Sequence, residues 1–142
     1  MLPAMADERL SQARILLQRR GIADADLLAP PIHDSWTRCL AAGLDPERPP
    51  PLTVVDDSTL REARDRSDLA LRLARTEMKN LYHQIAGTNF MIAFAAPDAL
   101  LLDTISDSSF SATARATAIR PGSHWAEIRC GTNALGTVAQ QG

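Results

Sequence analysis

Two short patterns place chemically capable residue types close together in this sequence. The stretch from Gly131 to Thr137 has the glycine spacing of half a phosphate-binding loop, but Thr137 stands where that loop needs a lysine to reach the terminal phosphates. We therefore interpret the stretch as a helix start whose small residues allow close packing. His33, Asp34 and Ser35 are consecutive, and neighbouring residues on a helix point in different directions. They are not expected to converge as a catalytic triad.

A third pattern joins Trp125 and Glu127, and it has two interpretations. A ring beside a carboxyl raises the carboxyl's pKa and can create a general acid. No second carboxylate or base accompanies the pair in the sequence, so we favour a structural role in which the glutamate binds backbone amides. Cys39 and Cys130 are far apart and lack the paired spacing of a zinc site, which indicates reduced thiols. We expect no enzyme activity, no metal and no cofactor.

The composition indicates a globular protein with a core of its own. The chain has 142 residues, of which 45% are hydrophobic and 23% charged. Its formal net charge is −2 and only 4% of its residues are aromatic, so neither a phosphate-binding face nor a base-stacking surface is expected. There is no signal-peptide pattern and no apolar run near the roughly 18 residues of a membrane span. These features predict a cytoplasmic protein without a membrane segment.

The elements that must position these residues begin with helices. Apolar periodicity predicts a helix over residues 5–20, ended by Gly21. A second helix is expected over residues 24–42, and because of the prolines at 30 and 31 it either forms two pieces or begins at Pro31. Four more prolines follow between Leu44 and Asp57 and indicate a linker or surface loop. Residues 1–57 are thus predicted to be a helical N-terminal region with a proline-rich linker.

The second part of the chain changes from helix to strand. A long amphipathic helix is predicted over residues 58–86, with Thr59 and Glu62 at capping-box spacing. It is expected to pack on a sheet with some dimer contact, the alternative being a pure coiled-coil arm. Strands are expected over residues 88–95 and 99–105, and residues 106–118 form either a loop or a short helix. A last helix begins near residue 132, capped by Thr132 or Asn133.

Two motifs taken together resemble one protein family. They are Ser35-Trp36-x-Arg38-Cys39, followed by Gly43-Leu44-Asp45-Pro46, and Pro121-Gly122-x-x-Trp125-x-Glu127, which leads into Gly131-Thr132-Asn133-Ala134-Leu135-Gly136-Thr137. In this order and spacing they resemble the N-terminal region of sigma-54-dependent transcriptional activators of the acetoin-catabolism regulator type, in the Fis family. Such activators carry a GAF sensing domain, an ATPase module and a DNA-binding helix-turn-helix. The resemblance covers the chain from about Ile32 to its end.

The resemblance implies an α+β fold in which N-terminal helices precede the first half of a GAF domain over residues 58–142. Two strands make too little sheet to be stable alone, so we expect this domain to be truncated. The implied function is sensing of a small effector by a bacterial regulator, with a tentative ligand pocket near Phe90, Ile92, Phe94 and Trp125. A homodimer through the helices is expected, whereas DNA and sigma-factor contacts would belong to regions absent from the chain.

One stretch departs from the family pattern, and one alternative function stays open. The family's hairpin turn is rich in aspartate and ends in glycine, whereas this chain has Ala96-Pro97-Asp98-Ala99, so turn geometry and any ligand contact there differ. The alternative is a stand-alone helical dimerisation or protein-interaction module. More strands and an ATPase motif encoded beyond Gly142 would favour the sensor, and a genuine stop would favour the small module.

Overall fold

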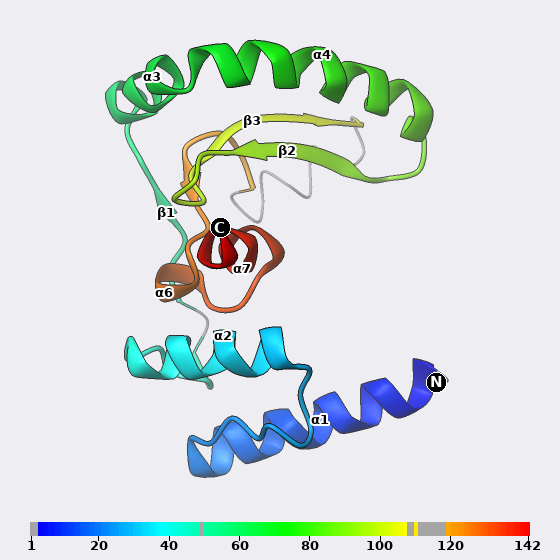
Figure 1. Cartoon of the computed structure of the whole chain (residues 1–142), viewed down its shortest axis with the longest axis vertical. Coiled ribbons are helices and arrows are strands. Elements are labelled where there is room, and N and C mark those ends of the chain that lie inside the picture. Colours follow the sequence, from blue (N-terminus) through cyan, green and yellow to red (C-terminus); the bar gives the residue numbers. More distant parts are fainter. Residues whose placement is uncertain (1–2, 49, 108–109, 111–118) are drawn as a thin grey trace. The chain divides into compact units, whose positions relative to one another are not determined.

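The chain folds as an α+β protein, as the sequence predicts. A computed structural model describes residues 3–48, 50–107, 110 and 119–142, and within these it contains six helices and two small antiparallel sheets. The chain divides into two compact units (Figure 1). Unit 1 comprises Met1–Pro51 and Ala126–Gln141, and unit 2 comprises Leu52–Trp125 with the terminal Gly142. The division predicted from the sequence, a helical N-terminal region over residues 1–57 and a partial GAF-like domain over residues 58–142, stays a prediction.

Unit 1 contains four helices drawn from both ends of the chain. They are α1 (Pro3–Arg20), α2 (Pro30–Ala41), α6 (Glu127–Cys130) and α7 (Ala134–Gln141). Gly21 ends α1 with a left-handed φ of 63° that glycine adopts without strain, as predicted. Of the two interpretations of residues 24–42, the structure supports a helix that begins at the prolines, where a missing backbone N–H costs nothing.

Unit 2 begins with a short strand and two consecutive helices. β1 (Thr53–Val54) leads into α3 (Asp57–Arg66) and α4 (Asp68–Ile85), so the single helix predicted over residues 58–86 is wrong in one respect. Ser67 interrupts it with φ −106° and ψ 14°. The predicted capping box at Thr59 and Glu62 is also wrong, because the cap is Asp56, whose carboxylate accepts the Thr59 backbone N–H at 2.7 Å. This bond lowers the pKa of Asp56.

The predicted hairpin is present. β2 (Met91–Ala95) pairs antiparallel with β3 (Leu101–Ser106), Ile92 lying opposite Ile105, with an irregularity between Phe94 and Ala95. Its turn has Ala99 in the left-handed region at φ 65°. β4 (Ser123–His124) pairs with β1, and the sequence predicted neither of these two strands. The expectation for residues 106–118 falls largely outside the described residues.

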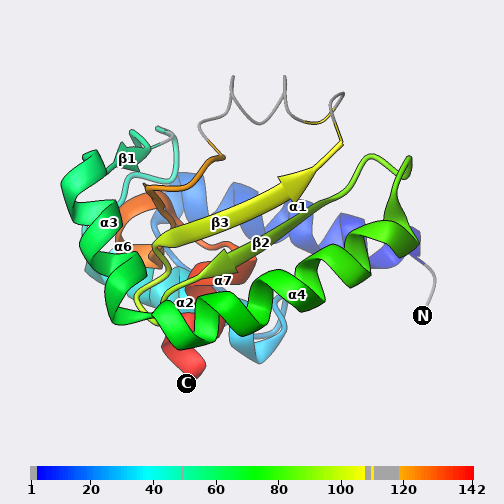
Figure 2. The same cartoon turned by 90° about the horizontal axis from the view of Figure 1, so that it is seen from above.

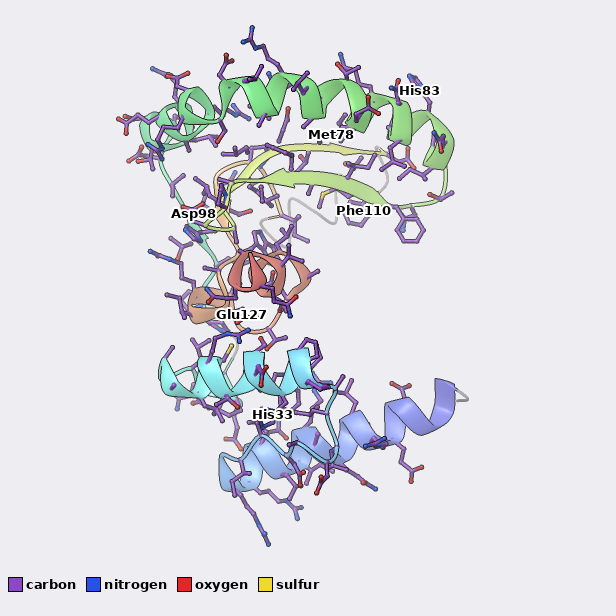
Figure 3. All side chains as sticks on the ribbon, in the orientation of Figure 1. His33, Met78, His83, Asp98, Phe110 and Glu127 are labelled. Atoms are coloured by element: carbon purple, nitrogen blue, oxygen red, sulfur yellow. The ribbon has the colours of Figure 1, made fainter. Side chains whose placement is uncertain are left out.

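The apolar core of unit 2 lies between its helices and the hairpin. Seen from above, α4 runs alongside β2 and β3 (Figure 2), and Met78 points from α4 toward the hairpin (Figure 3). The core cluster consists of the buried Ala63, Leu71, Leu100 and Leu102, with Val55, Leu60, Phe94 and Ala96 packed against it. The Arg64 Nε donates to the Leu102 carbonyl at 2.9 Å and ties α3 to β3. No helix in the described ranges has the length and apolar character needed to cross a membrane.

Candidate functional site

The centre of unit 1 is the carboxylate of Glu127, a fully buried side chain on α6. Arg38, on α2, donates two hydrogen bonds to this carboxylate, from Nε to Oε2 at 2.8 Å and from Nη2 to Oε1 at 3.2 Å. The Thr137 hydroxyl, on α7, donates to Oε1 at 2.7 Å. In Figure 3 the Glu127 side chain lies between α6 and α2. The carboxylate thus joins three helices, and its partners are side chains, not the backbone amides expected from the sequence.

This environment keeps Glu127 ionised. Burial alone raises the pKa of a carboxyl, since it removes water from the charged form. Here hydrogen bonds from Arg38, Ser35 and Thr137, together with the Arg38 charge, outweigh burial and place the pKa of Glu127 below its ordinary value. The pKa of Arg38 is raised, chiefly by its hydrogen bond to Glu127. A carboxylate that is charged at neutral pH and has its donors in place is suited to holding helices together, and it is a poor general acid.

A second contact joins α2 to the loop before α7. The hydroxyls of Ser35 and Thr132 are 2.7 Å apart and share a hydrogen bond. The Cys39 thiol donates to the Glu127 carbonyl at 3.6 Å and lies 3.8 Å from the Thr132 hydroxyl. Ser35 is fully buried and Cys39 nearly so. Residues quoted from the two sequence motifs therefore meet, although Ser35 and Thr132 lie 97 positions apart in the chain, and Cys39 and Glu127 lie 88 apart.

The Gly131–Thr137 stretch is a helix start, as the residues indicate. Gly131 has a φ of 83°, which turns the chain between α6 and α7. The Asn133 side chain caps α7 by accepting the Gly136 N–H at 2.9 Å, and its amide donates to the Gly131 carbonyl at 2.9 Å. Gly136 is buried. The cap selects Asn133 from the two predicted candidates, and it leaves the Gly136 N–H unavailable to a phosphate group.

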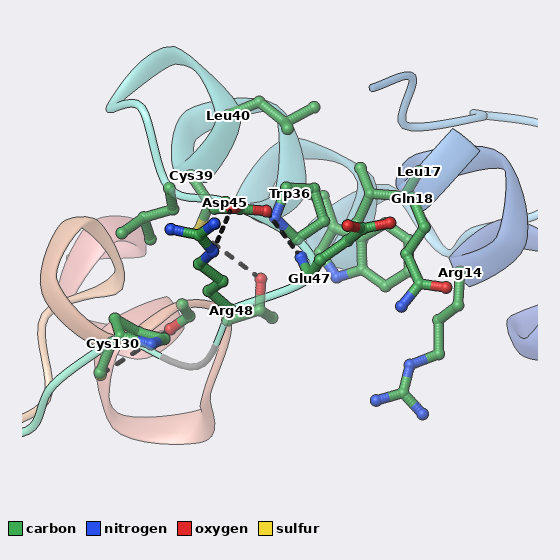
Figure 4. Close-up of a pocket in the computed structure, with 15 residues that line it drawn as sticks. Arg14, Leu17, Gln18, Trp36, Cys39, Leu40, Asp45, Glu47, Arg48 and Cys130 are labelled. Carbon is green, nitrogen blue, oxygen red and sulfur yellow. Dashed lines mark hydrogen bonds and ion pairs between the residues drawn. The ribbon is translucent and has the colours of Figure 1, made fainter. Parts of the chain in front are cut away.

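A pocket of about 410 Å³ lies beside this network in unit 1 (Figure 4). Its wall comes from α1, α2, residues 44–48 and 50, and the turn at residues 130–132. Trp36 supplies an aromatic wall, and Arg14 lies at the α1 side. The sequence does not predict this pocket, because the prolines between Leu44 and Asp57 indicate only a linker or surface loop. The sequence feature that could have indicated a pocket here is the group of charged residues Asp45, Glu47 and Arg48 among the prolines.

Both thiols of the chain also line the pocket, and both are free. Burial raises the pKa of Cys130 to about 11, and it also raises the pKa of Cys39. Both sulfurs are therefore protonated at neutral pH and are weak nucleophiles. Among the residues that the structure describes, no group of three or more His, Cys, Asp or Glu side chains could hold a metal ion.

The four tentative ligand residues of unit 2 do not line one common pocket. Ile92 lines a groove of about 410 Å³ with residues of α4, whereas Phe94 packs against the core. Phe90 lies just before β2 and is 66% exposed. The Trp125 indole N–H donates to the Ser123 hydroxyl at 2.8 Å. The three histidines, His33, His83 and His124, lie on α2, α4 and β4 and form no joint site.

Sequence similarity relates the chain to regulatory proteins. Over 112 residues, or 78% of its length, it is 32% identical to the acetoin catabolism regulatory protein of Cupriavidus necator. The chain spans 17% of the length of that relative. No model of a known protein family matches the chain, and no solved structure matches it. The similarity supports membership of a family of regulatory proteins.

Proposed function

We propose that this chain is the signal-sensing, non-enzymatic N-terminal region of a bacterial sigma-54-dependent transcriptional activator that works in the cytoplasm. The observation that carries the proposal is its similarity to the acetoin catabolism regulatory protein over 78% of the chain. A small effector binds in a GAF-like domain whose first elements are α4 and the hairpin. Contacts with DNA and with the sigma factor belong to parts of the protein outside this chain.

The structure of unit 2 supports this proposal in outline. A long helix packed along an antiparallel hairpin is compatible with a partial GAF-like fold. Ile92 points into a groove between β2 and α4, where an effector in contact with the sheet can alter the packing of the helix. Small-molecule sites are concave and largely apolar, and this groove combines Ala74, Met78, Leu81 and Ile92 with a few polar side chains.

A chimeric regulator tests the proposal. The matched region of the Cupriavidus necator protein is replaced by this chain, and a reporter is placed behind a promoter of acetoin catabolism. We expect inducible expression with acetoin as the first probe, and loss of expression in cells without sigma-54. The control chimera keeps the relative's own sequence in place of unit 2. Constant or absent expression from a chimera that accumulates normally and still binds DNA would reject the sensing role.

A second candidate function is self-association through α4. Leu69 and Leu73 lie four residues apart on this helix, and they are 67% and 64% exposed. Apolar side chains at this spacing form a stripe that a second helix can cover. The proposal is a homodimer, in which the chain acts as a helical interaction module.

Light scattering after size-exclusion chromatography tests this candidate. Replacement of both leucines by glutamate is expected to convert a dimer into a monomer, because four buried charges in the dimer cannot be solvated. Ile15→Glu is the matched control, since Ile15 is an exposed apolar residue on α1. A chain that is monomeric at every concentration before any substitution would exclude the dimerisation role.

A further inference from the structure

We infer that the pocket of unit 1 is a binding site for a small organic carboxylate with a flat apolar body. This site is formed by α1, α2, residues 44–48 and 50, and residues 130–132, so it is separate from the GAF-like unit. Its existence does not depend on effector binding in unit 2. The inference rests on the size of the pocket, its apolar walls, and the polar groups that face it without a partner.

The size and walls of the pocket fit a small flat molecule. Its volume of about 410 Å³ lies near the lower end of the roughly 300–1,000 Å³ range of ligand pockets. Leu17, Leu40, Leu44 and Pro50 give apolar walls, and all four are half-buried. The half-buried Trp36 indole provides a planar face on which a ring or conjugated group can stack.

The polar groups of the pocket favour an anionic end near α1. In the part of the chain that the structure describes, neither the Arg14 guanidinium nor the Trp36 indole N–H has a hydrogen-bond acceptor. Both groups are donors, and a guanidinium matches the geometry of a carboxylate. The pocket therefore offers two donors on the side formed by α1 and α2.

The loop side of the pocket is different, because its charges are already engaged. The Asp45 carboxylate accepts the Glu47 backbone N–H at 2.9 Å and faces the Arg48 guanidinium at 3.6 Å. The Glu47 carboxylate also lines the pocket. We therefore place the carboxylate of an anionic ligand at the exposed Arg14, and its apolar body between Trp36 and the leucines.

The pocket wall is also part of the buried network behind it. Thr132 and Cys39 line the pocket, and Thr132 shares its hydroxyl hydrogen bond with Ser35. The Cys39 thiol donates to the carbonyl of Glu127. A ligand that contacts Thr132 and Cys39 stabilises the contact between α2 and the loop before α7. Ligand binding can therefore change the packing of the helices of unit 1.

Titration with matched probes tests the site in the full 142-residue chain. The probes are benzoate and benzamide, which share a ring and differ in charge. Trp36 fluorescence is read in a Trp125→Phe background, which leaves a single indole, and calorimetry of the unaltered chain gives an independent value. We expect saturable binding of benzoate, about tenfold tighter than benzamide, since hydrogen bonds to charged groups are the stronger ones.

Substitutions on α1 assign the binding to the pocket. Arg14→Leu is expected to abolish the preference for benzoate, whereas Arg19→Leu, an exposed arginine of the same helix outside the pocket, leaves it unchanged. Circular dichroism confirms that each variant is folded. Absence of saturable benzoate binding at about 10 mM, equal affinity for the two probes, or an unchanged preference in Arg14→Leu would each overturn the inference.

Discussion

Unit 1 and unit 2 are held together by different kinds of interaction. In unit 1 the buried Glu127, Ser35 and Cys39 side chains make polar contacts that link α2 to α6 and the loop before α7, and Ala13 and Leu28 are buried as well. In unit 2 the described core cluster is apolar and lies between two helices and a hairpin that follow one another in sequence. In unit 1 directional hydrogen bonds join segments that are distant in the sequence. In unit 2 consecutive elements pack through apolar burial.

This difference has a consequence for how each unit responds to change. A polar network depends on every donor and acceptor, so the loss of one charge leaves its partner unsatisfied. An apolar core depends on volume and is insensitive to pH. Substitutions separate the two behaviours: Trp36 fluorescence in a Trp125→Phe background reports on unit 1, and Trp125 fluorescence in a Trp36→Phe background reports on unit 2.

The largest effect is expected from Leu102→Ala in the core of unit 2. Leu102 is fully buried, so the substitution creates a cavity and should lower the free energy of unfolding by about 3 kcal/mol. Urea unfolding followed at Trp125 measures the loss. Leu69→Ala, at an exposed position, is the control and should change the value by less than about 0.5 kcal/mol. Equal losses for the two variants would show that the core is elsewhere.

Glu127→Gln tests the network of unit 1 and should cost about 2 kcal/mol. The amide keeps the shape of the side chain but removes the charge that the Arg38 guanidinium binds with two hydrogen bonds. Urea unfolding followed at Trp36 measures the effect. Glu47→Gln, on an exposed loop, is the matched control and should be neutral. A Glu127→Gln chain as stable as the original would mean that the ion pair contributes nothing to unit 1.

The same residue should make unit 1 sensitive to acid. The pKa of Glu127 is lowered in the folded chain, so its stabilising contribution is complete above the pKa of an unfolded glutamate. The contribution is lost as the pH falls from there through the lower folded pKa. Unfolding measured at several pH values should show the original chain approaching Glu127→Gln in acid. A constant difference between the two chains down to the lowest pH would contradict the lowered pKa.

The smallest expected effect comes from Ala99→Gly in the hairpin turn. Ala99 has a φ of 65°, so glycine relieves backbone strain there. Two effects oppose this stabilisation: glycine has greater conformational freedom in the unfolded chain, and the buried methyl group of Ala99 is lost. The net change should stay within about 0.5 kcal/mol. Ala93→Gly, in regular β2, has no strain to relieve and should lose about 1 kcal/mol. Equal losses at the two positions, measured by thermal unfolding, would show that the turn is unstrained.

Local features of the fold were predictable because they depend on neighbouring residues. The start of α2 at two prolines, the glycine end of α1, the hairpin and the Asn133 cap all follow from short-range chemistry. The break at Ser67 was not predictable, since the apolar pattern continues through it. The cap at Asp56 was missed because Thr59 and Glu62 offered the same spacing.

The site was predictable only in part, for a different reason. The two motifs identified Ser35, Arg38, Glu127 and Thr132 as residues of interest, but no local rule states that they meet. Their contacts depend on the path of the chain between them. The pocket of unit 1 was missed entirely, since its walls come from four separate segments. The family resemblance implies a ligand pocket near Phe90, Ile92, Phe94 and Trp125, but residue type alone does not say which face of a strand a side chain occupies.

The discontinuity of unit 1 has a consequence for the order of events during synthesis. Its first stretch leaves the ribosome before residues 52–125, and its second stretch, with Glu127, comes after them. Translation of that intervening segment takes on the order of ten seconds, far longer than helix formation. Throughout that interval the Glu127 carboxylate is not yet available to Arg38, so α2 lacks its contact with α6. Unit 2, whose sequence is nearly continuous, is therefore expected to fold before unit 1 closes.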